Sequence, residues 1–81
     1  MIITVRLFAR ARDFAGADHL DVDLASGARI EELRDRLATS CPALAPLLRN
    51  SAISVNEEFA DDETVLSEGC KVAVIPPVSG G

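Results

Sequence analysis

The chain has 81 residues, which is enough for one small domain and too few for two separate cores. Its formal net charge of −5 argues against a nucleic-acid partner, because such binding needs a basic stripe, and favours a partner with a positive surface. No apolar run approaches the roughly 20 residues of a membrane span, and the N-terminus lacks the pattern of a signal peptide. We therefore expect a soluble cytoplasmic protein.

Residues that usually bind metals or perform acid–base chemistry are scarce. His19 is the only histidine, so a histidine-based triad or metal site has almost nothing to build on. Cys41 and Cys70 lie far apart without metal-ligand spacing, and we interpret both as free, mostly buried thiols. The acidic run 61–63 lacks the spacing of a calcium loop. The sequence thus predicts no metal site.

The first 24 residues predict two strands. Apolar and polar residues alternate over 2–9 and again over 19–24, as in half-buried strands. The segment 10–17 between them has polar and turn character, so the two strands are expected to form a hairpin. Phe8 is an aromatic residue on what should be the less buried face of the first strand.

The next segment predicts one main helix. Apolar residues recur at three- and four-residue spacing from about Ala28, and Pro42 ends the pattern because the residue before a proline avoids the α region. A second short turn is expected at 42–49. The rest of the chain predicts, in order, a strand at 53–55, a turn at 56–58, a short strand around Phe59, a helical turn at 64–68 and a strand at 71–75.

This order of elements predicts an α+β fold of the β-grasp, ubiquitin-like type, in which a mixed sheet carries one main helix on one face. The first and last strands would be parallel neighbours in the middle of the sheet. The β-grasp domain would span 1–75 and an extended tail 76–81. Phe8, Phe59 and Ile75 would cluster on the open sheet face as a docking patch, with scattered surface hydrophobes as the alternative.

The C-terminal segment has an unusual composition. Pro76 and Pro77 fix φ and remove two backbone donors, which predicts a stiff stalk of polyproline type up to roughly 20 Å long. Gly80 and Gly81 carry no Cβ, so the tip is as thin as a polypeptide can be. Such a tail could thread a terminal carboxylate into a narrow active site of another protein. A frayed chain end is the alternative.

These features resemble a known family, the small sulfur-carrying subunit of molybdopterin synthase (MoaD type). The likeness covers essentially the whole chain, and the Pro-Pro-Val-Ser-Gly-Gly ending is its most specific part. It rests on Leu7-Phe8-Ala9 followed by Arg12-Asp13, on Val55-Asn56-Glu57, on Leu66-Ser67-Glu68-Gly69 and on the run from Val72 to Gly81.

The resemblance implies a sulfur-transfer role. A ubiquitin-activating-like adenylyltransferase would use ATP to adenylate the carboxylate of Gly81, and a sulfur donor protein would supply the sulfur of a thiocarboxylate. The tail would then enter the large catalytic subunit, in an expected heterotetramer, and convert the cyclic pterin precursor to the dithiolene of molybdopterin. The chain itself would bind no cofactor and would be the non-catalytic subunit of this sulfurtransferase, because it supplies no acid or base near its tail.

The same resemblance assigns roles to individual residues. Gly81 would react and Gly80 would give clearance beside it, while Arg12 and Lys71 would make polar contacts at the rim of the docking patch. The residues expected to contact partner proteins are Phe8, Phe59, Ile75, Pro76, Pro77, Val78, Arg12 and Lys71.

Three other functions stay open. The first is a sulfur carrier for another pathway, such as thiazole synthesis for thiamine, although those carriers generally lack the Pro-Pro stalk. The second is a ubiquitin-like protein modifier joined to lysines through Gly81, with Lys71 as the only lysine for chain formation. The third is a binding module whose tail does nothing.

Overall fold

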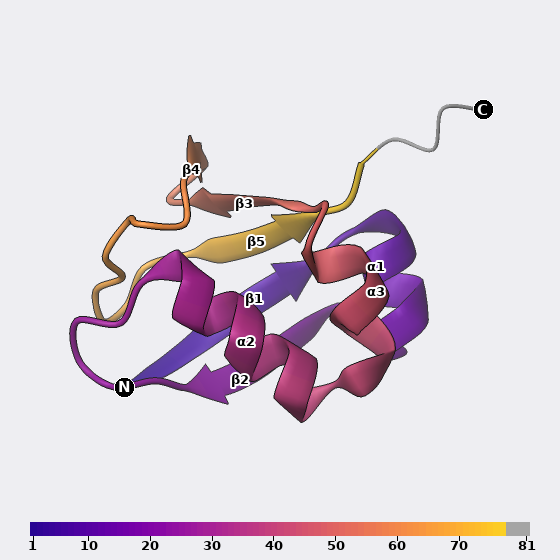
Figure 1. Ribbon diagram of the computed structural model, residues 1–81, viewed down its shortest axis with the longest axis horizontal. Coiled ribbons are helices and arrows are strands. Elements are labelled where there is room, and N and C mark those ends of the chain that lie inside the picture. The colour runs from indigo at the N-terminus through magenta and orange to yellow at the C-terminus, as the bar shows by residue number, and fades with distance from the viewer. Residues whose placement is uncertain (78–81) are drawn as a thin grey trace.

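The computed structural model describes residues 1–77, so the predictions for Val78, Gly80 and Gly81 lie outside the described residues. Two layers make up this part, a five-stranded sheet and helices that cover one of its faces (Figure 1). The elements are β1 (Ile2–Leu7), α1 (Ala9–Ala15), β2 (His19–Asp23), α2 (Ile30–Ser40), the 3₁₀ turn η1 (Pro42–Leu44), α3 (Ala45–Leu48), β3 (Ala52–Val55), β4 (Glu58–Ala60) and β5 (Val72–Ile75).

The sheet has the strand order β2-β1-β5-β3-β4. β1 and β5 are parallel, with Val5 opposite Val72, and the other neighbouring strands are antiparallel. The predicted parallel pair in the middle of the sheet is therefore confirmed, as is the α+β class. Because β5 is central, the last strand of the domain is held from both sides, and the chain leaves the sheet from its middle.

The core lies between the sheet and the helices. Strict two-residue alternation places every second side chain of β1 and β5 on this side, and α2 contributes the three apolar residues of one helical face. The leucines of η1 and α3 also pack inward, as predicted for 42–49. The fully buried large side chains are Ile3, Leu7, Ile30, Leu33, Leu37, Leu44, Ile53, Leu66, Val5, Val72 and Val74.

The prediction of a polar turn at 10–17 is wrong, because this segment contains α1. Alanine and arginine are strong helix formers, and Ala11 packs into the core with no exposed surface. Gly16 ends the helix in the left-handed region (φ 70°), where its N–H donates to the carbonyl of Arg12 over 2.9 Å. β1 and β2 are antiparallel neighbours as expected, but a helix joins them. Within residues 1–77, two short helices, α1 and α3, thus accompany the predicted main helix α2.

The predicted helical turn at 64–68 is also absent, because the backbone of this loop caps α2. The first N–H groups of a helix lack partners within it. Here the N–H of Ile30 donates to the carbonyl of Thr64, and the N–H of Glu31 to that of Asp62, both over 3.1 Å. A bridge between Arg29 and Val65 continues this extended contact. Among residues 1–77, none of the helices is long and apolar enough to cross a membrane.

Candidate functional site

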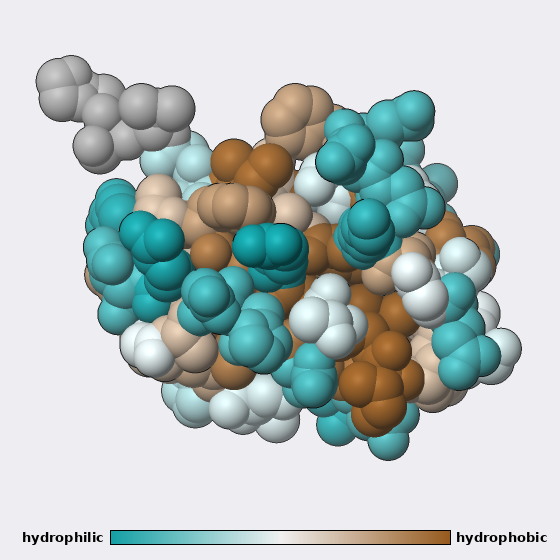
Figure 2. Space-filling view, turned by 180° about the vertical axis from the view of Figure 1, so that it is seen from behind, coloured by the Kyte–Doolittle hydropathy of each residue, from teal (hydrophilic) through white to brown (hydrophobic). Residues whose placement is uncertain are grey.

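The candidate site is the sheet face that the helices leave open. Figure 2 shows this face, where a hydrophobic band runs across the sheet between hydrophilic borders. An open groove of about 690 Å³ lies along the band, and side chains from β1 and β5 form most of its floor. Its volume is in the range of pockets that accept a ligand or a partner's side chains.

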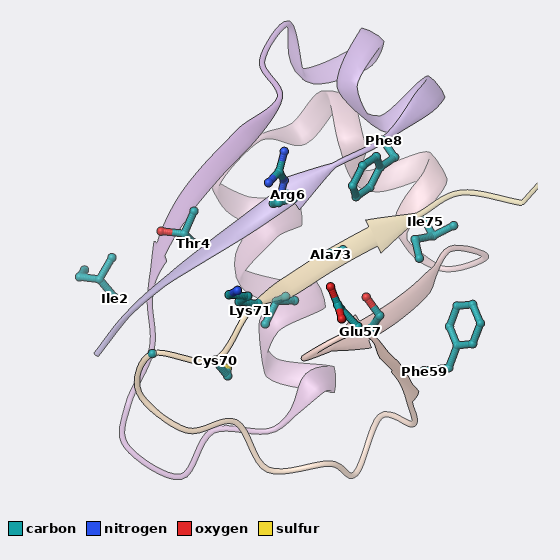
Figure 3. Close-up of a pocket in the computed structure, with 13 residues that line it drawn as sticks. Ile2, Thr4, Arg6, Phe8, Glu57, Phe59, Cys70, Lys71, Ala73 and Ile75 are labelled. Carbon is teal, nitrogen blue, oxygen red and sulfur yellow. The ribbon is translucent and has the colours of Figure 1, made fainter.

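The structure brings Phe8, Phe59 and Ile75 together along this groove (Figure 3). Phe8 is 43% exposed and follows the last residue of β1, while Ile75 is half-buried at the end of β5. Phe59 lies on the edge strand β4 and is 76% exposed, which is high for an aromatic side chain. An exposed apolar cluster of this kind is typical of protein interfaces. Partner binding by these three residues stays a prediction.

Charged side chains interrupt the apolar groove. Lys71, Glu57 and Arg6 line it, and within residues 1–77 none of the three forms an ion pair. The guanidinium of Arg6 lies over the ring of Phe8, 5.9 Å from its centroid. Unpaired charges beside an apolar surface restrict which partner can bind, because each needs an opposite charge once water is excluded.

The turn between β3 and β4 determines where Glu57 and Lys71 lie relative to each other. Asn56 and Glu57 both have positive φ, 52° and 72°, as a tight hairpin turn requires. The side-chain oxygen of Asn56 accepts a hydrogen bond from the backbone N–H of Lys71 (2.9 Å). The backbone N–H of Asn56 donates in turn to the backbone carbonyl of Lys71 (2.7 Å). Asn56 therefore fixes the start of β5 relative to the turn that carries Glu57.

Substituting Asn56 with alanine is expected to destabilise the domain by about 1–2 kcal/mol. The variant loses the bond from the Lys71 N–H and places a less tolerant residue in the left-handed region. Urea unfolding followed by circular dichroism measures the change. Asn50→Ala is the control, since Asn50 is exposed and its side chain makes no hydrogen bond in the described part of the chain. Equal stability of the two variants would contradict this role.

The tail begins differently from the prediction. Pro76 is buried against the domain, whereas Pro77 is exposed. The described part of any stalk thus starts at Pro77, and Pro76 fixes the direction in which the chain leaves β5. Lys71 lines the groove, whereas Arg12 lies on α1 and is not among the lining residues.

A second, small hollow at the edge of the sheet contains the only histidine. His19 is hydrogen-bonded to Asp18 over 2.7 Å, and this bond lowers the pKa of the Asp18 carboxyl. Both side chains are largely exposed, so the pair is a solvated surface contact. Within residues 1–77 no three potential metal-ligating side chains come together. Cys41 and Cys70 are both free thiols, as predicted.

Comparison with known proteins identifies the family of this chain. The model of the ThiS family matches residues 5–81. The chain belongs to the ThiS family. A relative from Chlamydomonas reinhardtii, a molybdopterin synthase sulfur carrier subunit, is 35% identical and matches over the full length of both chains.

Two solved structures share the fold of this ThiS-family chain. SAMP1 from Haloferax volcanii aligns over the whole of both chains with a TM-score of 0.89 and 27% identity. A chain in the complex of subunits 1 and 2 of molybdopterin-converting factor from Helicobacter pylori 26695 aligns over the whole of both chains with a TM-score of 0.71 and 27% identity. These likenesses confirm the predicted ubiquitin-like β-grasp fold.

The sequence did not predict every residue that lines the groove. The family match includes the tail, but the sequence did not predict that Glu57 and Arg6 line the groove. Alternation places Arg6 on the same face of the first strand as Phe8, but it assigns that arginine no role in binding. Phe14 was also missed, and it is 42% exposed on α1. The sequence predicted a turn over this segment and therefore gave no indication that Phe14 would be exposed on a helix.

Proposed function

We propose that this chain is the sulfur carrier subunit of molybdopterin synthase. The observation that carries the proposal is geometric: the chain leaves the central strand β5 beside an open, partly apolar groove, and four residues after Pro77 it ends in a diglycine. The groove offers a docking surface and the tail a reactive end. The name of the Chlamydomonas relative and the full-length match to it support the same role.

The chemistry of the tail fits this function. A carboxylate is a poor electrophile, and its oxygen attacks the α-phosphate of ATP to give an acyl-adenylate and pyrophosphate. A persulfide on a donor protein then displaces AMP to form an acyl disulfide, and a second thiol attacks the donor-side sulfur, which releases the thiocarboxylate of Gly81 and leaves a disulfide on the donor side. The thiocarboxylate is anionic and soft, so it can attack the pterin precursor without a base from this chain. The partner supplies any acid or base and the pterin pocket.

Two partner proteins share the groove in this proposal. An adenylyltransferase loads Gly81 and the large synthase subunit discharges it. The Helicobacter pylori structure is a complex of subunits 1 and 2 of molybdopterin-converting factor, which supports a large-subunit partner for a chain of this fold. Both proteins would bind the groove lined by Phe8, Phe59 and Ile75 and receive the tail that starts at Pro77.

The intact mass of the protein purified from its own cells tests the sulfur-carrier role. A population heavier by the exchange of one oxygen for one sulfur, mapped to Gly81 by peptide analysis, is expected. Adding the large subunit and the cyclic pterin precursor should return this population to the unloaded mass. Loading without discharge would indicate a carrier for a different pathway, such as thiazole synthesis.

A ubiquitin-like modifier is the second candidate, because the Haloferax volcanii structure of the same fold is named for a small archaeal modifier protein. In that case Gly81 would be found in amide linkage to lysines of other proteins. Peptide mapping of cell extracts separates the two functions. Absence of the sulfur-loaded mass together with such linkages would replace the carrier proposal.

Substituting Phe8 with aspartate is expected to weaken binding of the large subunit about tenfold without unfolding the domain. The change puts a charge where the groove is apolar, and Phe8 contributes little to the core because it is 43% exposed. Isothermal calorimetry measures the affinity. Val65→Asp is a matched control, since Val65 is 56% exposed and does not line the groove. Unchanged affinity of the Phe8 variant would exclude this face as the docking site.

A further inference from the structure

We propose that α1 is a second contact surface that continues the groove around the end of the sheet and takes an acidic segment of the large subunit. This inference rests on the proposed function, because it assumes that the large subunit receives the tail. It concerns Arg10 and Phe14, which lie outside the groove and have no role in the core. The helix surface formed by these two residues is called the α1 ledge below.

The position of α1 supports this role. Phe8 lines the groove and is also the N-cap residue of α1, so the helix starts directly at the docking face. α1 contacts β5, and Figures 1 and 3 both show it at the end of the sheet where β5 ends. A protein that covers the groove and receives the tail from Pro77 would therefore extend over α1.

The side chains of the α1 ledge are arranged for contact rather than for stability. Ala11 anchors the helix in the core, while Arg10 and Phe14, four residues apart, share the neighbouring face. The guanidinium of Arg10 lies over the Phe14 ring, 5.7 Å from its centroid, although 42% of Phe14 remains exposed. The stacked arginine needs less ordering on binding, because the ring already restricts its conformations.

The charge of the ledge is opposite to that of the chain as a whole. The chain carries −5, yet α1 holds Arg10 and Arg12 and only one acid, Asp13. Within residues 1–77 neither arginine side chain forms an ion pair. A guanidinium beside an exposed ring matches a carboxylate next to an apolar side chain. Attraction of acids here, and of bases to the acidic remainder of the chain, would fix one orientation of the partner.

Affinity for the large subunit at two salt concentrations tests the ledge. Arg10→Glu is expected to weaken binding roughly three- to tenfold at low ionic strength and to reduce the loss of affinity caused by salt. Phe14→Ser should weaken binding by a similar factor at both ionic strengths. Arg36→Glu is the control on the solvent side of α2, and it makes the same charge change away from the groove. An equal effect of Arg10→Glu and Arg36→Glu would overturn the proposal.

Chemical crosslinking identifies the contact directly. Lys71 is the only lysine, so Arg10→Lys adds a single readable amine. A carbodiimide activates a carboxylate, and the lysine amine displaces the reagent to form an amide without a spacer. We expect a crosslink from position 10 to an aspartate or glutamate of the large subunit, and none from Arg36→Lys. No crosslink from position 10 in a complex that still forms would overturn the ledge while leaving the sulfur-carrier proposal intact.

Discussion

Gly81→Ala is expected to lower sulfur transfer to the pterin precursor at least roughly a hundredfold, the size of effect that follows when a reacting group is displaced by about 1 Å. The added Cβ lies directly beside the reacting carboxyl carbon, in a tail that proceeds through two protein active sites. The domain itself should keep its stability, because its core is formed by residues between Ile3 and Val74. Single-turnover formation of molybdopterin with purified large subunit measures the loss.

A control in the same tail makes the Gly81 result specific. Ser79→Ala changes a tail residue without adding atoms next to the reacting carbon, and it should retain most of the activity. Intact mass then separates the causes, since failure to load sulfur indicates the adenylation step and loading without transfer indicates the synthase step. Normal turnover by Gly81→Ala would contradict the proposed mechanism.

Arg34→Met is expected to destabilise the domain by about 2–3 kcal/mol, since it removes charge-assisted hydrogen bonds from a largely buried site. The Arg34 side chain joins three segments that are distant in sequence. Its Nε donates to Asp62 over 2.8 Å, and its Nη1 donates to the backbone carbonyl of Ser51 over 2.8 Å and also to that of Leu48. These bonds connect α2 to the loop after β4, to the end of α3 and to the residue before β3.

Methionine keeps the length and the apolar stem of Arg34, so lost packing contributes little to this change. Arg36→Met is the matched control, because Arg36 is exposed on the same helix and its side chain makes no bond in the described residues. Urea unfolding of both variants gives the difference in free energy. If the two variants are equally stable, the Arg34 contacts contribute nothing to the fold.

The sequence by itself identified the strands β1 and β5, the main helix α2 and the unusual composition of the tail. Alternation over 2–9 and 71–75 identified β1 and β5, because a strand with one buried face must repeat with period two. The apolar spacing from Ala28 to Pro42 identified α2 in the same way, although the helix itself begins at Ile30. The tail was predicted from composition, since two prolines restrict the backbone whatever the fold and the two terminal glycines carry no Cβ.

Only the tertiary structure decided α1, the loop after β4 and the shape of the groove. α1 is seven residues long, too short to be stable alone, and it forms because Ala11 is buried against the core. The loop at 61–65 forms no helix because the carbonyls of Asp62 and Thr64 accept hydrogen bonds from the first N–H groups of α2, a contact between distant parts of the chain. Phe8, Phe59 and Ile75 meet for the same reason: sheet pairing, which no local pattern encodes, brings their strands together.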